Sequence, residues 1–195
     1  MVQHVVLTEE VAEGFMKEVK ITSADIDRVD LQQLYQTAFP EEEQIPWKEL
    51  MRLVDEMPLD FTAYYEGDAL IGLTIVYPRR TFNWFWYFAV KEELRGKGIG
   101  QQILTQLMER YKGQSTILDM ESPDHPSPNP EQRKRRHGFY LRNGFRDTHV
   151  YRTFDDNVFT ILMMGEGTFT KEDYDEILEE LHQHWWPDDM TIRDE

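Results

Sequence analysis

The order of predicted elements along the chain indicates an α+β fold, with one mixed, mostly antiparallel sheet of seven strands flanked by helices. Two pairs of β-rich segments are joined by short turns and predict antiparallel hairpins, while amphipathic helices separate the other strands. One segment, Thr81–Val90, is almost continuously apolar and aromatic, as expected for a central strand covered on both faces. Parallel pairing is expected only where a helix connects two neighbouring strands.

Seven segments have the alternating or continuously apolar character of strands. They are Lys17–Thr22, Phe61–Tyr65, Ala69–Tyr77, Thr81–Val90, Ser115–Met120, Arg146–Phe154 and Val158–Met164. Turn-forming residues at 66–68 and at 155–157 join two pairs of them into hairpins.

Five segments are predicted to form helices, four of them with apolar residues at helical spacing, and they carry the usual signals for helix ends. The first is expected to start at Ser23 or Asp25 and to end at Pro40, and the second to run from Pro46 to Pro58. The third starts at the end of the glycine-rich segment Arg95–Gly100 and ends at Gly113. The fourth starts at Glu131 and ends at Gly144, and the fifth runs from Lys171 to approximately Trp185. Four prolines make 122–130 a loop. The last helix, with Trp185 and Trp186 at its end, either covers the sheet or pairs with a second subunit in a homodimer.

Length and composition predict a single domain over residues 1–195, with a core of about 17–164 and an acidic helical extension of about 168–195. The chain has no cysteine, which excludes disulfides, thiolate metal sites and a cysteine nucleophile, and no paired-histidine pattern suggests a metal. A net charge of −16 argues against nucleic acid and anionic membranes as partners. No apolar segment is long enough to span a membrane, so we expect a cytoplasmic protein.

The segment Arg95–Gly100 (RGKGIG) lies between a predicted strand and a predicted helix, which is a favourable place to bind an anion. Glycines let the backbone approach phosphate oxygens, and unpaired N–H groups at the helix start point outward. Arg95 and Lys97 can add charge. The nucleotide P-loop pattern is absent, and the glycine spacing does not fit the dinucleotide fingerprint.

Two motifs in this chain resemble those of the GNAT superfamily of N-acetyltransferases. Arg95–Gly100 matches the family's Arg/Gln-x-x-Gly-x-Gly/Ala, and Phe139–Phe145 is similar to its Phe/Leu-Tyr-x-x-x-Gly-Phe. The resemblance implies the GNAT (acyl-CoA N-acyltransferase) fold and acetyl-CoA as cofactor. It places the cofactor's pyrophosphate on the backbone of Arg95, Gly96, Lys97, Gly98, Ile99 and Gly100, and its pantetheine arm beside the backbone of Phe88, Ala89 and Val90.

The same resemblance implies that the acceptor amine attacks the thioester directly and that Tyr140 protonates the departing thiolate. A core aromatic beside Phe139 is the alternative for Tyr140. Many family members carry a glutamate on the fourth strand, but Thr81–Val90 contains no carboxylate. Glu121, which follows the strand Ser115–Met120, is therefore the candidate for the base or for the group that binds the substrate cation; an exposed loop glutamate is the alternative.

Three further interpretations follow from the sequence. The basic residues 133–136 are expected to form mainly a solvated face, although contacts with the CoA 3′-phosphate or a substrate carboxylate stay open. The function expected is acetyl transfer to a primary amine of a small molecule or peptide. The alternative is a non-catalytic acyl-CoA-binding sensor or scaffold of the same fold.

Overall fold

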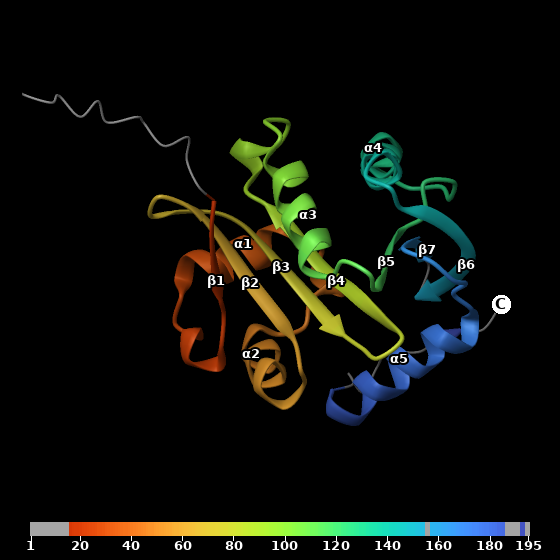
Figure 1. Ribbon diagram of the computed structural model, residues 1–195, viewed down its shortest axis with the longest axis horizontal. Coiled ribbons are helices and arrows are strands. Elements are labelled where there is room, and N and C mark those ends of the chain that lie inside the picture. The colour runs from red at the N-terminus through yellow and green to blue at the C-terminus, as the bar shows by residue number, and fades with distance from the viewer. Residues whose placement is uncertain (1–15, 155–156, 186–191, 194–195) are drawn as a thin grey trace, which may run out of the picture.

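The computed structural model describes residues 16–154, 157–185 and 192–193, which build one sheet with helices on both of its faces (Figure 1). The strand order is β1-β2-β3-β4-β5-β7-β6-β8. The strands are β1 (Lys17–Lys20), β2 (Asp60–Glu66), β3 (Ala69–Pro78), β4 (Phe82–Val90), β5 (Ser115–Glu121), β6 (Arg146–Phe154), β7 (Asn157–Met164) and β8 (Ile192–Arg193). The predicted α+β class and its seven strands are confirmed. The two-residue β8, which the sequence did not predict, adds to β6 at the edge.

Every strand pair is antiparallel except β4 with β5, which are connected through a helix, so the predicted limit on parallel pairing is also confirmed. The longer helices are α1 (Val29–Ala38), α2 (Trp47–Glu56), α3 (Ile99–Arg110), α4 (Pro130–Arg142) and α5 (Lys171–His184). Three short 3₁₀ turns are η1 (Ser23–Asp25), η2 (Glu41–Glu43) and η3 (Glu92–Leu94). No helix in the described part of the chain has both the length and the apolar character needed to cross a membrane.

The first helix differs from its prediction, because the chain turns once at η1 and becomes an α-helix only at Val29. Thr22 and Asp25 form a capping box around η1, and the side chain of Asp25 accepts a hydrogen bond from the Thr22 backbone N–H at 3.0 Å. Arg28 then adopts an extended backbone (φ −74°, ψ 91°), which separates the turn from α1. The apolar spacing that we assigned to one helix therefore covers two elements.

The two faces of the sheet are covered by different helices. Leu31 of α1, Leu50 of α2 and Ile177 of α5 belong to the larger core cluster on one face. Leu107 of α3 and Tyr140 of α4 belong to a second cluster on the other. The C-terminal helix α5 thus covers the sheet, which was one of the two roles predicted for it. Trp186 lies outside the described residues. A homodimer stays a prediction.

Strand β4 has an irregular pairing that shapes the centre of the sheet. Ile75 of β3 pairs with Tyr87, but the next residue, Val76, pairs with Phe85, so Trp86 is an extra residue in β4. This is a β-bulge, which bends the strand and redirects side chains. As a result, the consecutive residues Trp86 and Tyr87 both pack toward the larger core cluster.

Candidate active site

The glycine-rich segment forms the connection between β4 and α3, as predicted. Gly96 and Gly98 have positive φ values of 76° and 84°, a backbone conformation that side chains with a Cβ rarely adopt. Gly98 is the N-cap of α3, and the first helical hydrogen bond runs from Gln102 N–H to the Gly98 carbonyl at 3.1 Å. The N–H groups of residues 99–101 precede that bond and are available to an anion.

The loop, the end of β4 and α4 meet at Gly100. A Cβ at Gly100 would lie 3.6 Å from the Phe88 ring, 3.7 Å from Val90 and 3.8 Å from the Phe139 ring. The Arg95 side chain is exposed and its Nε donates to the Val90 carbonyl at 3.2 Å. The residues predicted to bind the two parts of the cofactor are therefore close together, and the exposed cations of the loop are beside them.

One edge of β4 lacks a neighbouring strand over most of its length. The edge toward β3 is paired from Asn83 to Val90, but the edge toward β5 is paired only from Phe82 to Trp84. β5 itself continues to Glu121, pairing with β7 on its far side. Over residues 85–90, an extended molecule could therefore hydrogen-bond to β4 in the manner of an added strand.

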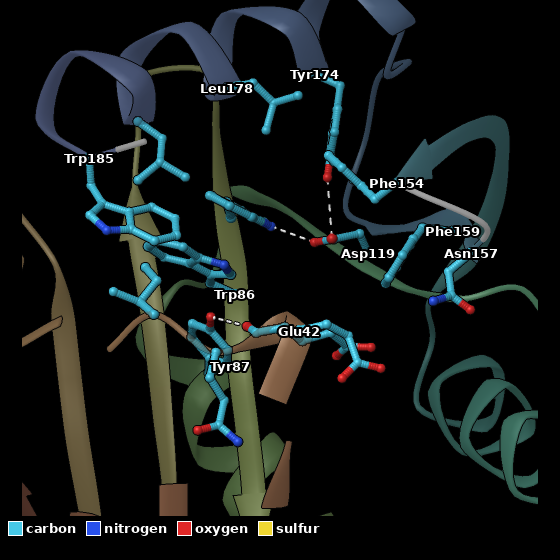
Figure 2. A pocket seen from close by; sticks show the side chains of 15 residues that line it. Glu42, Trp86, Tyr87, Asp119, Phe154, Asn157, Phe159, Tyr174, Leu178 and Trp185 are labelled. Atoms are coloured by element: carbon cyan, nitrogen blue, oxygen red, sulfur yellow. Dashed lines mark hydrogen bonds between the residues drawn. The ribbon is translucent and has the colours of Figure 1, made fainter. Parts of the chain in front are cut away.

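A cavity of ≈150 Å³ lies on the opposite face from α3, where β4 and β5 separate (Figure 2). Trp84, Trp86 and Tyr87 of β4 and Asp119 of β5 line it. Further walls come from η2, from β7 and from α5, which contributes Leu178 and Leu181; Trp185 follows that helix. The walls of this cavity come from elements distant in sequence, so no local sequence pattern predicts it.

Two carboxylates in this cavity have raised pKa values. Asp119 is half-buried, and desolvation raises its pKa; its two oxygens accept hydrogen bonds from Trp84 Nε1 at 2.7 Å and from the Tyr174 hydroxyl at 3.2 Å. Glu43 of η2 is half-buried. Desolvation, followed by the negative charge of Glu121, raises the pKa of Glu43 to about 7.

Glu43 is a candidate functional residue that sequence reasoning missed. Residues 41–43 are three consecutive glutamates that lie between two predicted helices. Nothing local distinguishes the third glutamate from its neighbours. What sets Glu43 apart is tertiary: the Tyr87 hydroxyl of β4 donates to its backbone carbonyl at 2.7 Å and fixes η2 against the sheet (Figure 2).

Glu121 lies at the end of β5, but it is buried and ion-paired, so the alternative of an exposed loop glutamate is wrong. Its Oε1 forms a salt bridge with Arg133, and its Oε2 lies 3.1 Å from Arg136 Nη2. Both oxygens are thus engaged by cations, an arrangement that suits a fixed ion pair better than a proton acceptor. The catalytic role of Glu121 stays a prediction that these contacts disfavour.

The expectation of a solvated face for residues 133–136 is also wrong for Arg133, which is only 3% exposed. The reason is helical geometry: Arg133 and Tyr140 are seven residues apart, two turns of α4, and both lie on its buried side. Arg133 Nη2 also lies 3.4 Å from the Asn157 side-chain oxygen, and Asn157 lines the cavity. The ion pair therefore supports one end of the cavity.

Tyr140 lies on α4 in the core cluster under α3 and α4. Its ring contacts those of Phe139 and Phe145, with centroids 5.4 and 5.6 Å away. Desolvation raises the pKa of Tyr140 to about 12, so the phenol keeps its proton at neutral pH. This state is the one that a proton donor requires, although the position alone fits a core aromatic as well.

Comparison with known proteins identifies the domain. The family model described as an acetyltransferase (GNAT) domain matches residues 59–147. A GNAT-family structure from Bacteroides thetaiotaomicron has 25% identity and a TM-score of 0.69, covering 86% of this chain and 96% of its own. No curated protein matches the chain.

Two structures with lower identity share the fold. The PaiA N-acetyltransferase from Thermoplasma acidophilum, solved in complex with coenzyme A, is 19% identical with a TM-score of 0.51, covering 78% of this chain and 99% of its own. A GNAT-family acetyltransferase from Elizabethkingia anophelis, solved with acetyl-CoA bound, is 15% identical with a TM-score of 0.54, covering 77% and 98%. The family-model match over residues 59–147 and the glycine loop after β4 show that the chain contains a GNAT acetyltransferase domain.

Proposed function

We propose that this chain is an acetyl-CoA-dependent N-acetyltransferase that moves an acetyl group to a primary amine of a small molecule or peptide by direct attack. The observation that carries the proposal is the gap between β4 and β5. An anion-binding loop opens onto one face of the sheet beside this gap, and a cavity with carboxylates opens onto the other. A thioester and an amine can thus approach each other from opposite faces.

The residues on the loop side fit coenzyme A. The N–H groups of residues 99–101, together with the positive-φ backbone at Gly96 and Gly98, suit a pyrophosphate. The unpaired edge of β4 at Phe88–Val90 suits the two amide groups of a pantetheine arm. Coenzyme A or acetyl-CoA in the structures from Thermoplasma acidophilum and Elizabethkingia anophelis supports this assignment.

Acetyl-CoA, when bound, supplies an acyl group activated as a thioester. The protein needs no nucleophile of its own, which agrees with the absence of cysteine. Its tasks are to hold the amine beside the β4 edge, to remove a proton from it and to protonate the leaving sulfur. Tyr140 is our candidate for the last task, since its phenol is protonated at neutral pH.

Thiol release from acetyl-CoA, measured with a panel of amines, tests the proposal. We expect release with at least one amine, and Tyr140→Phe should lower kcat by roughly 100-fold, the usual contribution of a general acid, while the calorimetric affinity for CoA stays unchanged. Micromolar CoA binding without release from any amine would instead support the non-catalytic acyl-CoA-binding function. An unchanged kcat in Tyr140→Phe would remove that residue from the mechanism.

A further inference from the structure

The cavity at the β4–β5 gap has a composition that selects among amines. Its walls are mostly aromatic and aliphatic, and Trp84 and Trp86 stack with their ring centroids 4.5 Å apart. Its charged lining consists of three carboxylates, those of Glu42, Glu43 and Asp119, and among the described residues no lysine, arginine or histidine lines it. Such a site favours a cation attached to an apolar body and disfavours a ligand that carries its own carboxylate.

The size of the cavity limits that apolar body. Its volume is ≈150 Å³. An apolar cavity of about 150 Å³ engineered into another protein binds benzene, so this one has room for roughly one six-membered ring or an aliphatic group of similar size. A larger acceptor would have to extend past the mouth toward solvent.

The three carboxylates have different surroundings. Both oxygens of Asp119 already accept hydrogen bonds from Trp84 and Tyr174 (Figure 2). Glu42 is exposed. Glu43 is half-buried, and no described residue forms a hydrogen bond or ion pair with its carboxylate. Of the three, Glu43 is the group whose carboxylate is both shielded and available.

The backbone around Glu43 is held firmly on the sheet side of the cavity. The Tyr87 hydroxyl donates to the Glu43 carbonyl at 2.7 Å. The Ile45 N–H donates to the Tyr35 hydroxyl at 2.9 Å, and that hydroxyl lies 3.2 Å from the Ile45 carbonyl. A catalytic group must be fixed in this way to act on a particular proton.

We propose that Glu43 binds the ammonium group of the acceptor and then removes its proton, and that the acceptor is a compact amine on an apolar body of about one ring, without a carboxylate. This inference rests on the proposed acetyltransferase function. It also assigns the base that β4 lacks to η2, on the other side of the cavity.

The proton and electron balance of the step is complete. The Glu43 carboxylate takes one proton from the ammonium, which frees the nitrogen lone pair. That pair forms the C–N bond with the acetyl carbon, and the C–S bond breaks with its electrons remaining on sulfur. The sulfur takes the Tyr140 proton, the phenolate recovers a proton from the new amide nitrogen, and Glu43 releases its proton to water. The products are the acetamide, the free thiol and one proton.

The most direct test of the preference for amines without a carboxylate compares 2-phenylethylamine with phenylalanine, which differs from it by one carboxylate. We expect kcat/KM to be at least about 100-fold higher for 2-phenylethylamine, because the extra carboxylate would face three others. Calorimetry in the presence of CoA should show the same order of affinity without any turnover. Equal kcat/KM or equal affinity for the two compounds would overturn the assigned substrate class.

The role of Glu43 is tested with Glu43→Gln, and Glu41→Gln, an exposed glutamate of the same turn outside the cavity, is the matched control. We expect Glu43→Gln to lower kcat/KM about 100-fold and to weaken 2-phenylethylamine binding about 10-fold, with CoA affinity and the Glu41→Gln variant unchanged. Wild-type turnover in Glu43→Gln would overturn the proposal. If the wild-type protein binds CoA but acetylates no amine, the proposed acetyltransferase function fails. Binding of 2-phenylethylamine that is lost in Glu43→Gln would in that case still support the assignment of the cavity as an amine-binding site.

Discussion

Removing the charge of Glu43 should stabilise the fold at alkaline pH while it impairs activity. Burial raises the pKa of Glu43 from 4.5 to about 7, so the folded state holds this proton more tightly than the unfolded state does. Below pH 4.5 both states are protonated and ionisation costs nothing. As the pH rises from 4.5 to 7, ionisation of Glu43 lowers the free energy of unfolding progressively, and above pH 7 the whole loss is present.

The size of this cost follows from the pKa difference. Each pH unit between the two pKa values corresponds to about 1.4 kcal/mol, so the interval corresponds to about 3 kcal/mol. Because Glu43 is half-buried and water screens its charge, we expect about 1–2 kcal/mol in practice. Glutamine keeps the shape of glutamate but not its charge, so Glu43→Gln should recover this free energy at pH 8 and little of it at pH 5.

Chemical and thermal unfolding at pH 5 and pH 8 measure the effect. Glu43→Gln should unfold at a temperature roughly 2–8 °C above wild type at pH 8, with a much smaller difference at pH 5. The exposed Glu41→Gln variant controls for the general loss of one negative charge from a chain of net charge −16. Equal stabilisation at both pH values, or the same pH dependence in Glu41→Gln, would refute the assignment of a costly buried charge to Glu43.

Three other substitutions test the site more locally. Gly98→Ala should cost about 1 kcal/mol of stability and weaken CoA binding at least 10-fold, because the φ of 84° at this position is strained for alanine. Gly113→Ala is the control, since Gly113 has a φ of 82° and lies just beyond the other end of α3. It should show the same loss of stability in chemical denaturation and no change of CoA affinity in calorimetry. Asp119→Ala should cost about 2–4 kcal/mol in urea unfolding, since two buried donors lose their acceptor, and Asp119→Asn should cost less because it keeps one acceptor. Arg133→Ala should cost about 3 kcal/mol by leaving Glu121 underpaired in the core, and a double-mutant cycle with Glu121→Gln should show a coupling well above that of a surface ion pair.

The strand and helix pattern of this chain was predictable because its signals are local. Hairpin turns, the apolar strand Thr81–Val90 and the glycine loop Arg95–Gly100 each depend on a few neighbouring residues. The division of the first helix into η1 and α1 was missed because apolar spacing does not report the extended backbone at Arg28. Helical periodicity on α4 could have indicated that Arg133 is buried with Tyr140, but a run of four cations favoured a solvated interpretation.

The cavity and Glu43 could not be predicted in the same way. The cavity depends on the separation of β4 from β5 after Trp84 and on a helix, α5, that lies nearly a hundred residues later. The bulge at Trp86 turns two consecutive side chains toward the same face, which breaks the alternation that sequence reasoning assumes for a strand. Such features are set by tertiary pairing and leave no local pattern.

Glu43 and Glu121 show why burial by itself does not identify a catalytic carboxylate. Both are shielded, and the negative charge of Glu121 contributes to the raised pKa of Glu43. Glu121 has Arg133 and Arg136 on its two oxygens, so its negative charge is compensated whether or not a ligand is present. Among the described residues, none forms an ion pair or hydrogen bond with the Glu43 carboxylate. The charge of Arg136 lowers its pKa from a distance, but burial and the negative charges of Glu121 and Asp119 raise it more strongly. An ammonium ion placed in the cavity would relieve the cost of ionising Glu43 directly, so the same imbalance that destabilises the empty fold should contribute to binding an amine and to accepting its proton.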